Sequence, residues 1–189
     1  ILNKNKNFYL KGQILNADKL IEHLLNSDDD SSLLPNKNFK IFIDIDKILL
    51  DEKHNLKDLK GHFSVKDQEI TNAKIAGSFS DNKKLKFTVK TVSNKKITTL
   101  FSDKAGALVE RYKFIKGFKG GVLDFYSSKD NFSKESNSKL KIYDFKLKEL
   151  PALTKLLTLA SLQGIADLLS GEGIGFDEFE MTFKNKKNT

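Results

Sequence analysis

Apolar and polar residues alternate with a period of two along most of this chain, and no other feature constrains its fold as strongly. Phe39, Ile41, Ile43 and Ile45 are each separated by one residue, and most of the residues between them are polar. The same pattern recurs in seven further segments, at 61–65, 73–79, 85–89, 97–101, 122–126, 140–148 and 179–183. Successive side chains of a strand point to opposite faces of its sheet, so each segment predicts a strand with one apolar face.

Short polar turns connect the predicted strands. Pairs such as Asp81-Asn82 and Ser93-Asn94 lie between consecutive apolar runs, which is typical of antiparallel hairpins. We therefore expect a mainly β protein with a few helices, built as an antiparallel β-meander. Near Tyr143 and Asp144 the apolar phase slips by one residue, which predicts a bulge there.

A sheet with one apolar face must cover that face. It can close into a sandwich, stack on a second sheet or hold lipid. The alternation alone leaves these three solutions open.

Three helices are expected beside the strands. Asn16 can cap a helix at about 17–25, and Ser102 can cap a shorter one at about 103–112. A third helix is expected at 151–170, from Pro151 to the glycine at position 171. Residues 1–150 are then mostly sheet, and 171–189 form a turn and a strand. Because the first residue is Ile, we interpret 1–189 as one segment of a longer protein.

Composition excludes several classes of function. The chain has no cysteine, so disulfide scaffolds, zinc ribbons and thiol nucleophiles are excluded. The longest uncharged apolar run, 156–166, is shorter than the roughly 20 residues that span a bilayer.

The net charge of +8 comes from lysines spread along the whole chain, and Arg111 is the only arginine. Base readers and phosphate clamps favour the planar fork of arginine, so we expect no nucleic-acid site. We interpret the spread lysines mainly as a solvated surface; the alternative is an anionic partner, such as phospholipid headgroups, attracted by their diffuse positive field.

Two patterns resemble catalytic motifs. Asp44 and Asp46 end an apolar run, as in the nucleophile strand of haloacid-dehalogenase phosphatases, but Lys47 and more apolar residues follow where a Gly-Thr turn is needed. The glycine-rich segment 171–175 follows a predicted helix and opens a strand, the reverse of a phosphate-binding loop. We interpret the aspartates as the polar side of a strand and the glycines as a turn.

The three histidines, at positions 23, 54 and 62, have no metal-ligand spacing, and we expect them at the surface or its boundary. No group of residues resembles a nucleophile with its base and orienting partner. The sequence therefore predicts no enzymatic activity, no metal site and no cofactor.

Several segments, in order, resemble the AsmA-like proteins of Gram-negative bacteria, and especially their YhdP-like branch. They are Leu59-Lys60-Gly61-His62-Phe63, the strand at 70–77, Phe101-Ser102-Asp103-Lys104-Ala105-Gly106-Ala107-Leu108, Gly120-Gly121-Val122-Leu123-Asp124 and Asp144-Phe145. The C-terminal part of the resemblance consists of Leu153, Leu156-Leu157, Ala160-Ser161-Leu162, Gly164-Ile165, Leu168-Leu169, Gly171-Glu172-Gly173-Ile174 and the segment 176–183. The resemblance spans roughly 56–183, and its last forty residues are the most specific.

This resemblance implies a periplasmic segment of a protein anchored in the inner membrane. In that family the sheet curls into a long open trough, along which phospholipids are thought to pass between the inner and outer membranes. It implies no bond-making chemistry. The implied partners are phospholipid acyl chains, the two membranes and the rest of the same polypeptide, whose strands would continue beyond residue 189.

If the chain is such a conduit, apolar residues of the strands line the trough, and headgroups stay near its wet opening. The expected lining residues are Ile41, Ile43, Ile45, Phe63, Val65, Ile75, Phe79, Leu85, Phe87 and Val89. The alternative is a structural or scaffold module that aids outer-membrane assembly, in which the helix at 151–170 fills the sheet as its core.

Overall fold

The structure is a computed structural model, and it describes residues 2–4, 6–18, 37–109, 117–133, 135–148 and 173–185. The predicted helix at 151–170, His23 and most of the predicted helix at 17–25 lie outside these residues. No helix within the described ranges has the length and apolar character needed to cross a membrane.

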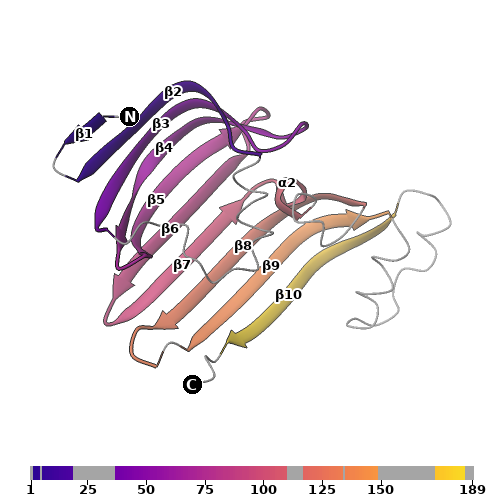
Figure 1. The fold of residues 1–189 in the computed structure, drawn as a ribbon. Helices are drawn as coiled ribbons and strands as arrows, with labels where there is room; N and C mark the ends of the chain where they lie inside the picture. The colour runs from indigo at the N-terminus through magenta and orange to yellow at the C-terminus, as the bar shows by residue number, and fades with distance from the viewer. Residues whose placement is uncertain are drawn as a thin grey trace.

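The described residues form a single sheet of ten strands that follow one another in sequence order (Figure 1). The strands are β1 (Leu2–Lys4), β2 (Asn7–Asn16), β3 (Phe39–Leu49), β4 (Asn55–Lys66), β5 (Glu69–Phe79), β6 (Lys84–Val92), β7 (Lys95–Ser102), β8 (Phe118–Asp130), β9 (Ser136–Leu147) and β10 (Ile174–Asn185). One short helix, α2 (Ala105–Val109), lies between β7 and β8. The expected mainly β meander is confirmed, and its sheet is open.

Two features at the start of the sheet were not predicted. Residues 7–16 form a strand, β2, and it pairs with β3 in parallel. All pairs from β3 to β10, and the pair of β1 with β2, are antiparallel. A parallel pair needs a long crossover connection, which residues 17–38 supply. The purely antiparallel prediction is therefore wrong at this one pair.

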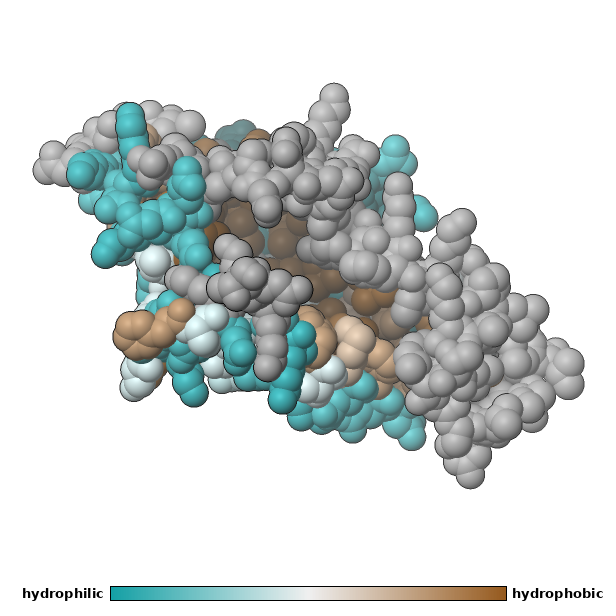
Figure 2. All heavy atoms as spheres, turned by 60° about the horizontal axis from the view of Figure 1, so that its bottom comes forward, coloured by the Kyte–Doolittle hydropathy of each residue, from teal (hydrophilic) through white to brown (hydrophobic). Residues whose placement is uncertain are grey.

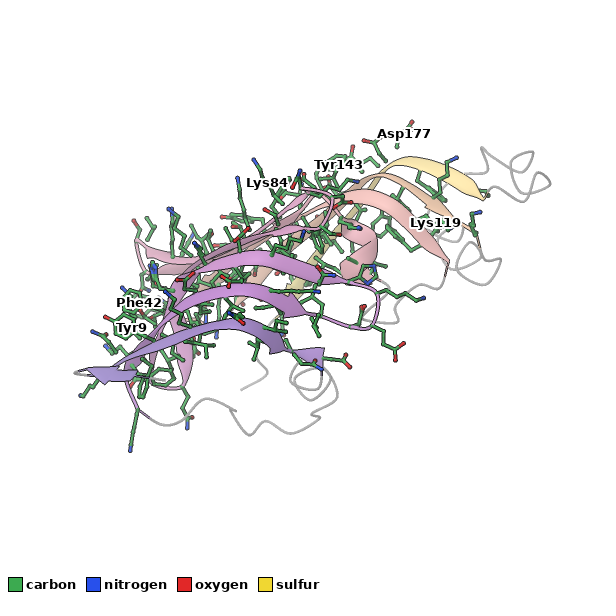
Figure 3. The ribbon with its side chains drawn as sticks, turned by 90° about the horizontal axis from the view of Figure 1, so that it is seen from above. Tyr9, Phe42, Lys84, Lys119, Tyr143 and Asp177 are labelled. Carbon is green, nitrogen blue, oxygen red and sulfur yellow. The ribbon has the colours of Figure 1, made fainter. Side chains whose placement is uncertain are left out.

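The sheet curls around one of its faces and forms an open trough, with the strands running across its length (Figures 1 and 3). We call the concave side the inner face and the convex side the outer face. The floor of the hollow is hydrophobic where it is visible, and hydrophilic residues flank it (Figure 2). Phe42, Lys84 and Tyr143 lie on the outer face (Figure 3).

The predicted change of phase in β9 is present at Asp144. Ile142 and Phe145 are three residues apart, yet both are buried on the inner face, at 4% and 2% exposure. Asp144 has a φ of 52°, in the left-handed region, and its side chain is exposed. One residue in this conformation turns the following side chains to the other side of the strand.

The neighbouring strands change phase at the same level, so β9 carries no inserted residue. Pairing continues in the same register on both sides of Asp144, against β8 and against β10. The predicted bulge is thus right as a change of phase and wrong as an insertion. A true register shift occurs in β4, between Lys57 and Lys60, where Asp58 has a φ of 51°.

Helix α2 lies on the inner face. It begins at Ala105 rather than at position 103, and residues after 109 lie outside the described part of the chain. The Ser102 hydroxyl accepts a hydrogen bond from the backbone N–H of Lys104 at 3.1 Å, which orients the segment entering the helix. Ala105 and Ala107 are 0% and 2% exposed, so the helix is packed tightly onto the sheet.

Candidate functional site

A row of apolar residues crosses the inner face from β3 to β10. Its members lie directly opposite one another on neighbouring strands, and we call them the central row: Ile43, Gly61, Ile75, Phe87, Leu100, Phe125, Leu140 and Met181. Neighbouring strands are about 4.8 Å apart, so the row extends roughly 34 Å along the trough. Only the glycine interrupts its large apolar side chains.

On one side of the central row, helix α2 covers the inner face. Ala107 packs in a buried cluster that includes Ile45, Phe79 and Leu85. Ala105 packs in a second cluster over the last three strands, whose other buried members are Val109, Phe118, Leu123, Ile142, Phe145, Leu147 and Ile174. The helix therefore joins the two ends of the sheet across the hollow and closes this half of the inner face.

The side chains of the central row itself are only partly covered. Ile43, Ile75 and Phe87 are half-buried, and Met181 at the end of the row is 42% exposed. Leu100, Phe125 and Leu140 are also half-buried, although they touch the buried clusters at their edges. The inner face thus has a covered half beneath α2 and a partly open half that begins at the central row. We call this second part the open half.

The expected lining residues divide between these halves. Ile45, Phe79 and Leu85 lie in the covered half, in the cluster with Ala107. Half-buried members of the open half are Ile41, Ile43, Phe63, Ile75 and Phe87. Val65 and Val89 lie on the same side of the central row as the open half, but they are buried, at 2% and 3% exposure, and belong to neither cluster.

Four large apolar residues of the central row were not named as lining residues from the sequence: Leu100, Phe125, Leu140 and Met181. Each lies in a segment that was predicted as a strand, and each faces the same side as Phe87. These residues could have been identified from their positions in the apolar alternation of each strand, combined with the register of the hairpins.

On β7, β8 and β9 the open half becomes polar away from α2, whereas the corresponding residues of β3 to β6, next to the central row, are apolar. Next to the central row, Thr98, Ser127 and Ser138 lie opposite one another on β7, β8 and β9. The Ser138 hydroxyl donates to the Ser127 hydroxyl at 2.8 Å, and Ser138 is only 6% exposed. We call these three residues the hydroxyl row.

A charged cluster lies beyond the hydroxyl row, and we call it the basic rim: Glu69, Lys96 and Lys129. Lys96 Nζ lies 2.6 Å from Glu69 Oε2, and Lys129 Nζ lies 3.2 Å from Glu69 Oε1. The hydrogen bond from Lys96, joined by that from Lys129, lowers the pKa of Glu69 to about 2. The carboxyl group is therefore ionised at neutral pH and holds both ammonium groups near one another.

The two aspartates of the Asp-x-Asp pattern belong to the polar side of β3, as expected. Asp44 lies in the middle of the strand, with Lys11 Nζ and Lys60 Nζ each 3.6 Å from its carboxylate oxygens. Asp46 is exposed, and β3 continues to Leu49. Within the described residues, no group of three or more acidic or histidine side chains is arranged to hold a metal ion.

The two described histidines lie on or near the surface. His62 is half-buried on the outer face and bonds Asn72 Oδ1 through Nε2 at 3.1 Å. His54 is the last residue before β4, with Nδ1 2.9 Å from Asp51 Oδ2. Of the glycine-rich segment 171–175, Gly173 has a φ of 86° and Ile174 begins β10, as a turn before a strand requires.

The outer face is mostly charged and aromatic. On β2 and β3, Tyr9 stacks on Phe42 with ring centroids 5.0 Å apart, and Lys40 Nζ lies 4.7 Å from the Phe42 ring centroid. At the other end of the sheet, Lys141 Nζ lies within 2.8 Å of carboxylate oxygens of both Glu178 and Glu180. These ion pairs connect β10 to β9 on the outer face of the sheet.

Comparison of the chain with models of protein families, with curated proteins and with solved structures gave no match. The relation to AsmA-like proteins consequently remains a prediction from the motifs of the sequence.

Proposed function

We propose that the open half of the inner face holds the acyl chains of phospholipids and lets them move along the trough. The observation that carries this proposal is the central row, in which large apolar side chains on seven strands are aligned yet only partly covered. Soluble proteins rarely leave so extended an apolar surface without a ligand or partner.

Hydrophobic burial is sufficient for this activity. Each methylene group that leaves water against the central row contributes about 0.8 kcal/mol. Because the side chains are similar along the row, an acyl chain gains little by staying at one strand rather than the next. Weak and repeated binding along a continuous apolar path moves a lipid without any bond being made.

As in the proteins that the motifs resemble, the chain would act in the periplasm as part of a longer protein anchored in the inner membrane. Its partners would be the remaining trough of the same polypeptide and the inner and outer membranes. The proposed route runs along the row, across the strands, because a further strand added at an edge would extend the same inner face.

A second candidate function is a scaffold that aids outer-membrane assembly without carrying lipid. The observation in its favour is helix α2, whose alanines join two buried clusters across the hollow. If the rest of the inner face is also filled by the protein itself, the central row is core and no lipid binds.

The matched variants Phe87→Asp and Lys86→Asp separate these two functions. The residues are neighbours on β6, but Phe87 faces the open half and Lys86 is exposed on the outer face. In a chain purified from a Gram-negative host, we expect native mass spectrometry to find bound phospholipid in the wild type and in Lys86→Asp. We expect its loss in Phe87→Asp, because an acyl chain lying against position 87 would remove the new charge from water.

Thermal unfolding of the same variants completes the test. A conduit predicts that Phe87→Asp stays folded, since its side chain is already partly exposed. Absence of lipid from the wild type, together with a large loss of thermal stability in Phe87→Asp, would favour the scaffold.

A further inference from the structure

The basic rim places two lysines side by side on the inner face. Lys96 and Lys129 lie directly opposite each other on β7 and β8, and like charges in this position repel. Glu69 comes from β5, two strands away from β7, and binds both ammonium groups. One carboxylate between two ammonium groups leaves the basic rim with one uncompensated positive charge.

The two lysines are less exposed than ordinary surface lysines. Their side chains are 18% and 30% exposed, for Lys96 and Lys129 respectively, while that of Glu69 is 45% exposed. Charged groups with this much burial interact more strongly with an added anion than fully exposed ones do. The uncompensated positive charge would therefore attract an anion bound at the inner face.

The chemistry of the inner face changes in a fixed order along β7 and β8. On β7, Leu100 belongs to the central row, Thr98 to the hydroxyl row and Lys96 to the basic rim. On β8 the corresponding residues are Phe125, Ser127 and Lys129. With a rise of about 3.3 Å per residue, the basic rim lies roughly 13 Å from the central row along each strand.

This order matches the parts of one phospholipid molecule. Acyl chains suit the central row, ester and glycerol oxygens suit the hydroxyl row, and a phosphate suits a pair of ammonium groups. A ligand that is apolar throughout, such as a sterol ester, would have no anionic group to pair with the uncompensated positive charge. A free phosphate would have no apolar group to lie against the central row.

We propose that Lys96 and Lys129 bind the phosphodiester of a phospholipid headgroup whose acyl chains lie against the central row. Glu69 is a positioning residue in this site, because it holds the two ammonium groups together against their repulsion. This inference rests on the proposed function and adds to it the class of headgroup that the trough selects.

The test compares two lipids that share their acyl chains, phosphatidylglycerol and diacylglycerol. The variants are the double substitution Lys96→Gln/Lys129→Gln and the matched pair Lys86→Gln/Lys90→Gln, which removes the same charge from exposed residues of the outer face. Binding of each lipid from detergent micelles is measured by native mass spectrometry. A melting curve shows that each variant is folded.

We expect the wild type to prefer phosphatidylglycerol by about tenfold, as expected for a charge-assisted hydrogen bond. Lys96→Gln/Lys129→Gln should lose this preference and still bind diacylglycerol, whereas Lys86→Gln/Lys90→Gln should keep it. The charge-preserving variant Lys96→Arg/Lys129→Arg should keep the preference for phosphatidylglycerol. These results together would support the site.

Other outcomes overturn the inference in distinguishable ways. If Lys96→Gln/Lys129→Gln keeps the preference, the proposed function stands and the headgroup site does not. If excess glycerol phosphate binds the wild type as tightly as phosphatidylglycerol does, the site serves a free phosphate instead. If neither lipid binds the wild type, the proposed function fails together with this inference.

Discussion

Ala105 of helix α2 lies over Gly121 of β8, at a point where the strand presents no side chain. A Cβ atom added to Gly121 would lie 3.2 Å from the Ala105 Cβ and 3.1 Å from the Phe145 Cβ. Gly121 also has a φ of 82°, in the left-handed region that side chains disfavour. The glycine therefore provides the space in which the helix sits on the sheet.

From this contact we predict that Gly121→Ala lowers the free energy of unfolding by about 1–3 kcal/mol, through backbone strain and displacement of the helix. The matched control is Gly175→Ala in β10, because an added Cβ there meets no atom within 4 Å. That change should stay within about 0.5 kcal/mol of the wild type. Chemical denaturation of both variants checks the prediction, and equal losses would contradict it.

Phe145 lies at the centre of an aromatic stack that crosses three strands. Its ring centroid is 4.8 Å from that of Phe118 and 5.0 Å from that of Phe176, and the rings are nearly parallel. We expect Phe145→Ala to lower the free energy of unfolding by about 3–5 kcal/mol, because it removes a buried ring from a packed cluster. Phe132→Ala is the control, since Phe132 is 85% exposed. Similar stability of the two variants would show that the stack contributes little.

The stability of the chain should depend on pH through Glu69. Its pKa is lowered from 4.5 to about 2 in the folded protein, first by the hydrogen bond from Lys96. A lowered carboxyl pKa stabilises the folded state above about pH 4.5, and this contribution disappears as the pH falls to about 2.

We therefore expect Glu69→Gln to be less stable than the wild type at neutral pH, and the difference to shrink between pH 4.5 and 2. Glu52→Gln, an exposed residue between β3 and β4, should show no comparable difference at neutral pH. Urea unfolding across this pH range measures both. A difference for Glu69→Gln that stays constant with pH would refute the role given to its carboxylate.

The Asp-x-Asp pattern of β3 gives a prediction about chemistry. Asp44 lies in the middle of a continuous strand between Lys11 and Lys60, rather than at a strand end that opens to a substrate. We expect no magnesium-dependent phosphatase activity that Asp44→Asn abolishes. An assay with a general phosphate ester, run on the wild type and on the variant, decides this; activity that the substitution removes would mean that the chain is an enzyme.

The strands could be predicted from the sequence because one face of the sheet is apolar. The alternation around Ile41, Ile43 and Ile45 fixes which side chains share a face, and the slip between Ile142 and Phe145 reveals the change of phase. Strand β2 was missed because Tyr9 and Ile14 are apolar residues that lie exposed, which obscures the alternation. Its parallel pairing with β3 could not be predicted, since a period of two is the same for parallel and antiparallel strands.

The division of the inner face could not be predicted either. Alternation identifies the apolar side of a strand, but it does not show which part of that side a helix covers. Leu85 and Phe87 have the same pattern in the sequence, yet Leu85 packs in the cluster with α2 and Phe87 belongs to the open half. The basic rim depends in the same way on pairing between distant strands, because Glu69 and Lys129 are sixty residues apart.

The most direct test of the lipid-binding proposal is a photo-crosslinker placed at position 87 and, in a second variant, at position 86. The chain is produced in a Gram-negative host, irradiated and analysed by mass spectrometry for covalently attached lipid. We predict phospholipid adducts from position 87, which faces the open half, and none from position 86 on the outer face. Absence of lipid adducts at 87, or equal adducts at both positions, would contradict the account.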